Sequence, residues 1–464
     1  MEEKGVSSLV VVVIVIVIAA VGVGSYFLLK GEGEGGLTPH DPIYINGNSD
    51  FTLANGVVAG SGTMDDPYII ENWGISAENA HGIEIRNTTA HFMVRSCVVE
   101  NGGETYRGIR LDNVVNGRIE NNTCSNNYIG IYLWDSDYNP IENCAAANNY
   151  RGIELGNSKN NLITNCIAKN NDEFGIGLFY SKNNTIKNCI SENNEDGFYL
   201  SESSNNTIEN CIAKNNDQCS IGLFNSFNNT LSHNTCENSE FCVYLQEASD
   251  NNIIENCIAK NNDFGIWLRK SSNNTVENCI AKNNNEFGIG LFPDSENNTI
   301  KNCISENNTN GVYFSGSSNN IVENCIAKNS NKYSISLFDS ENNVIKNYIS
   351  ENNETGICLS GSSNNTIENC IAKNNKYGID LFNSENNRIY HNNIANNMNQ
   401  AYDNGSNYWD DGYPSGGNYW SDYAGEDNYQ GENQNVPGSD GIGDTPYHIF
   451  GDNNQDRYPL MNPI

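Results

Sequence analysis

Two acidic side chains and one arginine occupy the same place in three copies of a short motif. Glu84, Arg110 and Glu154 are each the third residue of a Gly-Ile-x-Leu or Gly-Ile-x-Ile tetrapeptide. Glycoside hydrolysis uses two carboxyl groups, one on each side of the scissile bond. A cation beside them can stabilise developing negative charge. These three residues are therefore the catalytic candidates that we predict.

Aromatic residues take the same third position in other copies of the motif. Side chains alternate along a strand, so this position should point outward. A file of outward rings could bind a sugar chain, whereas the alternative is that the rings only stabilise a sheet above intervening glycines. The predicted ligand-binding residues are Tyr132, Tyr199, Tyr244, Trp267 and Tyr313.

Four acidic residues near the end of the chain could bind calcium through oxygen. Asp422, Asp427, Asp440 and Asp444 lie within a segment rich in Gly, Tyr and Trp. Calcium takes six to eight oxygen ligands. Their spacing is not that of an EF-hand, and Asx turns account for it equally well.

The chain has 15 Cys, and most of them keep one slot of a repeat. A repeated free Cys packs as a small hydrophobe; disulfides and metal binding are the alternatives. Copper would need soft ligands that converge, and the 6 His and 5 Met show no ligand spacing, so copper is the weakest cofactor prediction. The cysteines that share the slot are Cys144, Cys166, Cys189, Cys211, Cys257, Cys279, Cys303, Cys325 and Cys370.

Six Asn-Asn-Thr tripeptides also share one place in the repeat. Each is an N-glycosylation sequon on an expected turn. The repeat supplies these sequons whether or not they are used, so glycan occupancy stays open. The asparagines are Asn183, Asn205, Asn228, Asn273, Asn297 and Asn364.

All of these positions belong to a repeat with steps of about 22 or 23 residues, and a fixed period of this length is typical of a solenoid. The segments between its short Ile-rich runs are Asn-Asn, Ser-Ser-Asn-Asn and Glu-Asn-Asn, which favour turns over helix. We therefore predict an all-β, single-stranded, right-handed parallel β-helix of about 14 coils. Stacked strands should lie about 4.8 Å apart.

Charges along the repeat support this stacking. The residue after the first Ile of each copy alternates in sign, for example Lys301, Glu323 and Lys346. Opposite charges directly across a ladder are favourable. The alternation fails once, at Glu255 and Glu277, which predicts one irregular join.

The ends of the chain differ from the repeat. Residues 1–30 contain an uncharged apolar run long enough for a transmembrane helix, and residues 31–36 read as a flexible linker. Residues 37–80 and 400–464 are predicted N- and C-terminal caps on the repeats of residues 81–399, because a solenoid needs atypical ends. We expect a single-pass membrane protein with most of its chain outside the cell.

Composition limits the partners. The formal charge is −32 and the sequence has no basic stripe, which argues against binding to nucleic acid. Such acidity is a solubility device for an exposed protein.

The Asn-Asn-Thr-Ile-Glu-Asn coils, the Gly-Ile-x-Leu markers and the block Gly-Gly-Asn-Tyr-Trp-Ser-Asp-Tyr together resemble archaeal cell-surface proteins of the NosD-type family, which carries CASH repeats. The resemblance covers residues 40 to 464 and implies the right-handed β-helix. Three functions remain open. The chain could bind or display cell-surface polysaccharide, it could be a polysaccharide lyase or glycoside hydrolase, or it could be a copper-linked accessory protein as the family name implies.

Overall fold

The computed structural model describes residues 36–464, and in both of its units the chain winds as a parallel β-helix. The predicted transmembrane helix, residues 1–30, lies outside the described residues, as does nearly all of the predicted linker. Within residues 36–464 no helix is long and apolar enough to cross a membrane. The chain makes about 15 turns, against about 14 predicted, and its described residues divide into two compact units, residues 36–194 and 195–464.

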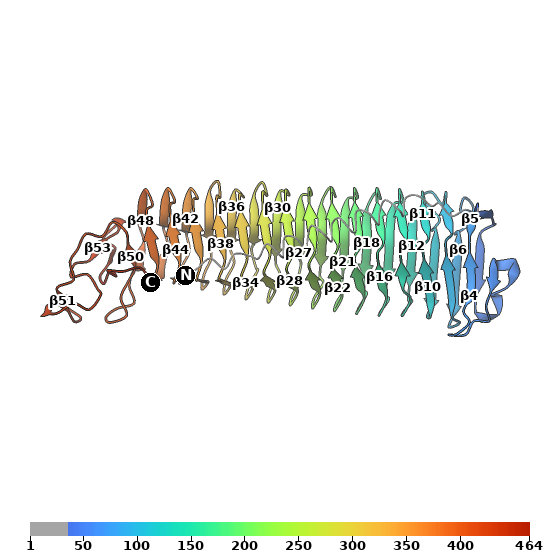
Figure 1. Cartoon of the computed structure of the whole chain (residues 1–464), viewed down its shortest axis with the longest axis horizontal. Helices are drawn as coiled ribbons and strands as arrows, with labels where there is room; N and C mark the ends of the chain where they lie inside the picture. Colours follow the sequence, from blue (N-terminus) through green and yellow to red (C-terminus); the bar gives the residue numbers. More distant parts are fainter. Residues whose placement is uncertain (1–35) are drawn as a thin grey trace. The chain divides into compact units, whose positions relative to one another are not determined.

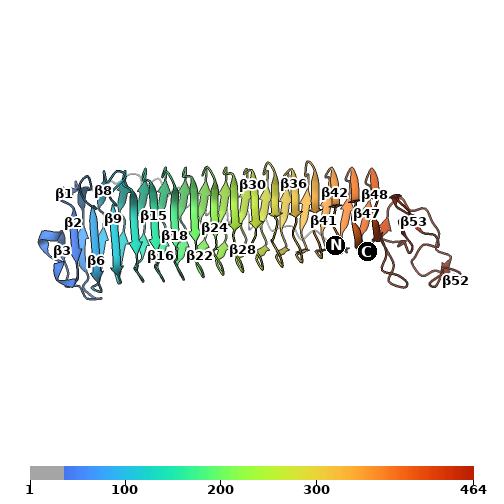
Figure 2. The same ribbon diagram turned by 180° about the vertical axis from the view of Figure 1, so that it is seen from behind.

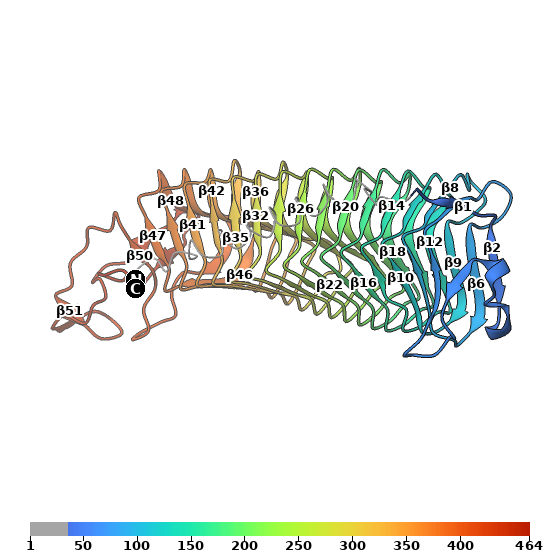
Figure 3. The same ribbon diagram turned by 45° about the vertical axis from the view of Figure 1, so that its right-hand side comes forward.

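Each turn contributes one strand to each of three sheets. Sheet 1 holds the Gly-Ile strands, sheet 2 holds the strands that follow Asn-Asn, and sheet 3 holds the Ile-Ala-Lys strands and their variants. In the first unit the strands lie side by side in chain order (Figure 3). Sheet 1 there comprises β2 (Ile43–Asn46), β6 (Ile83–Thr88), β9 (Ile109–Val114), β12 (Ile129–Trp134), β15 (Arg151–Gly156) and β18 (Phe174–Phe179).

The other two sheets of the first unit follow the same order. Sheet 2 comprises β3 (Val57–Ala59), β4 (Tyr68–Glu71), β7 (Phe92–Arg95), β10 (Gly117–Glu120), β13 (Ile141–Glu142), β16 (Leu162–Thr164) and β19 (Thr185–Lys187). Sheet 3 comprises β1 (Thr38–Pro39), β5 (Trp73–Ser76), β8 (Val98–Glu100), β11 (Thr123–Ser125), β14 (Ala145–Ala147), β17 (Ile167–Lys169) and β20 (Ile190–Glu192). The short 3₁₀ helices are η1 (Asn48–Asp50) and η2 (Leu53–Asn55).

The second unit repeats the pattern (Figure 2). Sheet 1 comprises β21 (Asp196–Ser201), β24 (Cys219–Phe224), β27 (Phe241–Gln246), β30 (Phe264–Arg269), β33 (Phe287–Leu291), β36 (Asn310–Ser315), β39 (Tyr333–Phe338), β42 (Thr355–Ser360), β45 (Tyr377–Phe382) and β48 (Asn399–Asp403). Sheet 2 comprises β22 (Thr207–Glu209), β25 (Thr230–Ser232), β28 (Ile253–Glu255), β31 (Thr275–Glu277), β34 (Thr299–Lys301), β37 (Ile321–Glu323), β40 (Val344–Lys346), β43 (Thr366–Glu368), β46 (Glu385–Tyr390) and β49 (Ser406–Tyr408). Sheet 3 comprises β23 (Ile212–Lys214), β26 (Thr235–Glu237), β29 (Ile258–Lys260), β32 (Ile280–Lys282), β35 (Ile304–Glu306), β38 (Ile326–Lys328), β41 (Ile349–Glu351), β44 (Ile371–Lys373), β47 (Asn393–Ala395) and β50 (Tyr419–Trp420).

The strands of the three sheets pair in parallel, as the repeat predicts, except that β3 pairs antiparallel with β4. On sheet 1, Ile131 pairs with Ile153 and Leu133 pairs with Leu155. All four side chains are fully buried. Because every turn adds such residues at the same places, the core between the three sheets is a set of continuous Ile, Leu and Val columns.

The turns are made by asparagines in the left-handed region, such as Asn143 at φ 53° and Asn165 at φ 54°. Asn enters this region more readily than most residues. The next residue of each turn then fills the inside of the corner. At two corners this residue is a buried Asn: Asn298, for example, donates its backbone N–H to Oδ1 of Asn320 at 2.8 Å.

Cysteine fills the third corner, between sheets 2 and 3. Cys303 donates its backbone N–H to Sγ of Cys325 at 3.3 Å. Asn122 and Asn234 take the same slot in other turns and accept the same kind of bond. All 15 cysteines are buried and free, so the packing interpretation is the one that the structure supports.

Residues 37–80 contribute a turn of their own, because β2, β4 and β5 pair in parallel with β6, β7 and β8. At the other end, β54 (Phe450–Gly451) pairs with β48. The loops beyond β48 carry β51 (Tyr429–Gln430), β52 (Val436–Pro437), β53 (Tyr447–His448) and β55 (Gln455–Asp456) (Figure 1). Trp409 and Trp420 are buried there, and their indole N–H groups donate to Asp403 and Asp456 at 2.8 and 2.9 Å.

Candidate functional site

Sheet 1 of the first unit brings the predicted catalytic residues into one file. The register pairs Glu84 with Arg110, Arg110 with Tyr132, and Tyr132 with Glu154. Tyr132 therefore separates Arg110 from Glu154. This order follows from one motif position recurring once per turn.

Glu84 and Arg110 form part of a compact ion-pair cluster. Arg110 contacts Glu84 at 3.3 Å and Asp112 at 2.9 Å. Arg86 contacts the same two carboxylates at 3.8 and 3.0 Å. Two guanidinium groups thus offset two carboxylates, and neither acid is left free to act on a substrate without breaking an ion pair.

Glu154 belongs to a second ion pair. Its carboxylate contacts Arg151 at 2.9 Å, and Arg151 also contacts Glu173 at 2.6 Å. Glu154 is only 7% exposed, although its motif position was expected to point freely into solvent. Burial raises the pKa of Glu154, while Arg151 opposes that shift. The three predicted residues therefore do not converge on one point.

Two residues that the sequence did not single out complete this region. His81 accepts the backbone N–H of Arg107 on Nδ1 at 3.0 Å, and its Nε2 lies 3.1 Å from Nη1 of Arg110. Burial, and then the charges of Arg110, Arg107 and Arg86, lower the pKa of His81 to about 4. The imidazole is therefore neutral at physiological pH.

The Arg107 guanidinium lies over Tyr132, with its carbon 4.3 Å from the ring centroid. It covers a ring that was expected to be exposed, and Tyr132 is only 8% exposed. The length of the repeat could have revealed the loop that carries Arg107. The step from Gly82 to Gly108 is 26 residues, whereas the step from Gly108 to Gly130 is 22. The extra residues form the loop 101–107.

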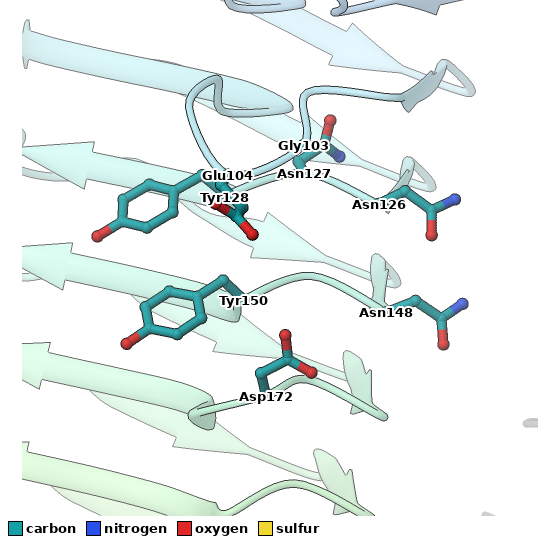
Figure 4. Close-up of a pocket in the computed structure, with 8 residues that line it drawn as sticks. All are labelled: Gly103, Glu104, Asn126, Asn127, Tyr128, Asn148, Tyr150 and Asp172. Atoms are coloured by element: carbon teal, nitrogen blue, oxygen red, sulfur yellow. The ribbon is translucent and has the colours of Figure 1, made fainter.

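A depression of about 630 Å³ lies beside this loop. Tyr128 and Tyr150 line one side, with ring centroids 5.3 Å apart and an interplanar angle of 8°. Figure 4 shows the two rings in parallel from successive turns, with Glu104 and Asp172 among the other residues that line the depression. Such a concave surface with aromatic and polar walls is suited to a ligand.

In the second unit the predicted aromatic file lies on sheet 1 as expected. Tyr199 pairs with Gly222, and Gly222 pairs with Tyr244. Trp267 pairs with Gly290, and Gly290 pairs with Tyr313. Tyr199, Tyr244, Trp267 and Tyr313 are all partly exposed.

The sequence analysis missed the phenylalanines that flank this file. Phe292 stacks on Trp267 with centroids 3.8 Å apart and an angle of 9°. Its ring leaves no room for a side chain at Gly290, where an added Cβ would lie 2.8 Å from Phe292 Cε2. We call the resulting surface the aromatic face. It comprises Tyr199, Phe224, Phe241, Tyr244, Phe264, Trp267, Phe287, Phe292, Tyr313, Tyr333 and Phe338.

One polar group in the aromatic face lacks a partner. The Trp267 Nε1–H is shielded from solvent and has no hydrogen-bond acceptor among the described residues. A buried donor without an acceptor costs free energy. The stacked rings that cover Trp267 therefore enclose one unsatisfied donor.

The carboxylates predicted to bind calcium are occupied by protein donors. Asp427 accepts Ser439 Oγ at 2.7 Å and the backbone N–H of Gly441 at 2.9 Å, and these donors lower its pKa against the effect of burial. Asp444 accepts the backbone N–H groups of Asn428 and Tyr429. Asp422 accepts Tyr447 Oη, and Asp440 accepts the Ile442 N–H.

The described residues include no group of three or more His, Cys, Asp or Glu arranged to hold a metal ion. The six sequon asparagines, by contrast, are all exposed at turns. Their φ angles lie between 56° and 58°, which is the left-handed conformation of the other turn asparagines.

Two family models match the sequence. The one described as a right handed beta helix region matches residues 41–197 and 190–313, which together are more than half of the chain. The one described as periplasmic copper-binding protein (NosD) matches residues 265–425. No curated protein matches the sequence.

Several solved structures are similar in fold. The A-module of the mannuronan C-5 epimerase AlgE6 from Azotobacter vinelandii is 14% identical, with a TM-score of 0.37, over 72% of this chain and 89% of that one. The periplasmic alginate epimerase AlgG is 13% identical, with a TM-score of 0.40, over 74% and 82%. The catalytic domain of a GH87 alpha-1,3-glucanase with nigerose is 14% identical, with a TM-score of 0.38, over 71% and 64%. At this identity the likeness concerns the fold alone.

The matched repeats agree with the stacked turns, the buried Asn and Cys corners and the three parallel sheets described above. The chain belongs to the right-handed parallel β-helix family, and its residues 265–425 are similar to the NosD family.

Proposed function

We propose that the chain binds a sugar chain on the aromatic face of sheet 1 in the second unit. The observation that carries this proposal is the partly exposed file of contacting rings around Trp267. A large contiguous apolar surface of this kind marks an interaction site, and aromatic rings offer flat faces with much contact area.

The geometry of the sheet favours an extended ligand. Successive strands lie about 4.8 Å apart, so rings from Tyr199 to Phe338 form a surface that runs along several turns. The proposal places this face outside the cell, with the apolar run of residues 1–30 as its membrane anchor.

The test is affinity electrophoresis of the protein against a panel of soluble neutral and acidic polysaccharides. Trp267→Ala and Tyr244→Ala should each weaken binding by about tenfold or more, equivalent to about 1.4 kcal/mol. Phe227→Ala is the matched control, because Phe227 is 41% exposed but lies on a turn outside the aromatic face.

Retained binding in both face variants would refute the proposal, provided that circular dichroism shows them folded. The same reactions can be assayed for new reducing ends or unsaturated products, which would favour a lyase or hydrolase instead. Metal analysis of protein purified without oxygen addresses the copper-linked alternative.

A further inference from the structure

Arg107 differs from the other arginines of sheets 1 and 2 in the first unit. Among the described residues its guanidinium forms no ion pair and no hydrogen bond. Its Nε–H is shielded from solvent without an acceptor, a feature that it shares with Arg86, Arg110 and Arg118. A guanidinium has five donors and no acceptor. The arginines that do form ion pairs there are Arg86, Arg95, Arg110, Arg118 and Arg151.

The loop that carries Arg107 is fixed by backbone contacts on both sides. Tyr106 donates its N–H to Gly102 at 3.0 Å, and Tyr128 donates its N–H to Tyr106 at 2.9 Å. The N–H of Arg107 itself is held by His81. These bonds fix the backbone of Arg107, and stacking on Tyr132 places its guanidinium, which reduces the entropy that a ligand must overcome.

The position of Arg107 links the charged cluster to the depression. Its guanidinium carbon lies 4.3 Å from the ring centroid of Tyr132 and 5.8 Å from that of Tyr128. Tyr128 in turn lines the depression together with Tyr150. A ligand seated against the two stacked tyrosines would thus present one side to Arg107.

The guanidinium of Arg107 and the residues around it indicate which kind of ligand group could bind there. A planar guanidinium binds carboxylate or sulfate oxygens through paired hydrogen bonds. The rim also carries Glu104 and Asp172, which disfavour a ligand with a dense run of negative charges. The net charge of −32 does not prevent an anion from binding at Arg107. Salt screens charges that lie more than about 8 Å away, so distant acidic residues act only weakly on a ligand there.

We propose that Arg107, with Tyr128, Tyr132 and Tyr150, forms a subsite for one carboxylate or sulfate group carried on a sugar chain. Arg107 binds the anionic group, and the stacked tyrosines contact the sugar ring. This subsite lies in the first unit and does not depend on the aromatic face of the second.

The test is titration calorimetry of the full chain with three probes on neutral backbones: a xylo-oligosaccharide that carries one glucuronate, its methyl ester, and a galactan oligosaccharide that carries one sulfate. The acid or the sulfated probe should bind at least tenfold more tightly than the ester. Arg107→Gln should abolish that difference and leave ester binding unchanged. Arg118→Gln is the control, because Arg118 is an ion-paired arginine of sheet 2 and should leave all three affinities unchanged.

Comparison of the carboxylate probe with the sulfated probe shows which of the two anionic groups the subsite prefers. Equal affinity for charged and neutral probes, an unchanged preference in Arg107→Gln, or no binding of any probe would each overturn the subsite. Trp267→Ala separates this result from the proposed function, since that variant should lose contacts in the second unit but keep the preference for the anionic probe.

Discussion

Glu255 lies directly opposite Glu277 on adjacent strands of sheet 2, so two like charges face each other across a parallel ladder. Lys260 and Lys282 face each other in the same way on sheet 3. The normal arrangement follows one strand later, where Lys301 contacts Glu277 at 2.9 Å. The irregular join predicted from the alternation of charges is therefore confirmed at a defined pair of strands.

Reversing the charge of Glu255 should stabilise the second unit. In Glu255→Lys the new ammonium faces Glu277 on one side and the neutral Ser232 on the other. A repulsive pair becomes an attractive one, and such cross-strand pairs contribute about 0.2–1 kcal/mol. Urea unfolding at low ionic strength should show this gain, and the gain should shrink in high salt.

The reciprocal control is Glu323→Lys. Glu323 faces Lys301 and Lys346, so this change turns two attractive pairs into two repulsive ones and should destabilise the protein by about twice the gain expected for Glu255→Lys. If both variants shift the midpoint in the same direction, the charge ladder does not set the strand register.

Asn320 tests the interior corners. Its Oδ1 accepts the backbone N–H of Asn298 at 2.8 Å, and its Nδ2 donates to the Ser295 carbonyl at 3.1 Å. Asn320→Ala leaves both groups buried without a partner, at about 1–3 kcal/mol each. We expect a loss of about 2–5 kcal/mol and faster hydrogen exchange at the Asn298 amide. Ser318→Ala, at a half-exposed position of the same turn, should change stability by less than about 0.5 kcal/mol.

Much of the fold was predictable because one motif position recurs in every turn. The period alone places Asn320 beneath Asn343 and Cys303 beneath Cys325. The period likewise places Tyr199, Gly222 and Tyr244 next to one another on successive strands of sheet 1. In a solenoid each repeat contacts mainly its neighbours. Residues that share a motif position in successive repeats can therefore be predicted to contact each other.

The candidate sites were less predictable, because they depend on departures from the repeat. Arg107 lies in an inserted loop that has no counterpart in the next turn, so no register argument could place its side chain over Tyr132. Phe292 comes directly after its Gly-Ile-x-Leu motif, but its ring turns back over Gly290. Rotamer choice of this kind depends on neighbouring turns rather than on the repeat itself.

Gly290→Ala tests whether the aromatic face needs its glycines. The added methyl group would lie 2.8 Å from Phe292 Cε2, so the ring must move away from Trp267. We expect a red shift of tryptophan emission and a weaker near-ultraviolet circular dichroism signal, with far-ultraviolet spectra unchanged. Phe292→Ala removes the same stacked ring without adding a methyl group, and should give the same optical change. An unaltered emission spectrum in both variants would contradict the stacking of these two rings.

Asp380 predicts a pH dependence of stability. Its carboxylate is 5% exposed, and Oδ1 has no hydrogen-bond partner among the described residues. Burial raises the pKa of Asp380 from 3.8 to about 6. Between these values the folded protein keeps a proton that the unfolded chain releases, so stability is greatest below pH 4 and falls as pH rises through 6.

The fall attributable to this group is at most about 3 kcal/mol, since each pKa unit corresponds to about 1.4 kcal/mol. Asp380→Asn removes the titrating group while keeping its size, so it should be more stable than the wild type above pH 6 and nearly equal to it at pH 4. Denaturation midpoints of the two proteins should be compared between pH 4 and 8, because the difference between them cancels the titration of the other acidic residues. A difference that stays constant over this range would show that Asp380 ionises normally, and that water or a rearranged side chain reaches Oδ1.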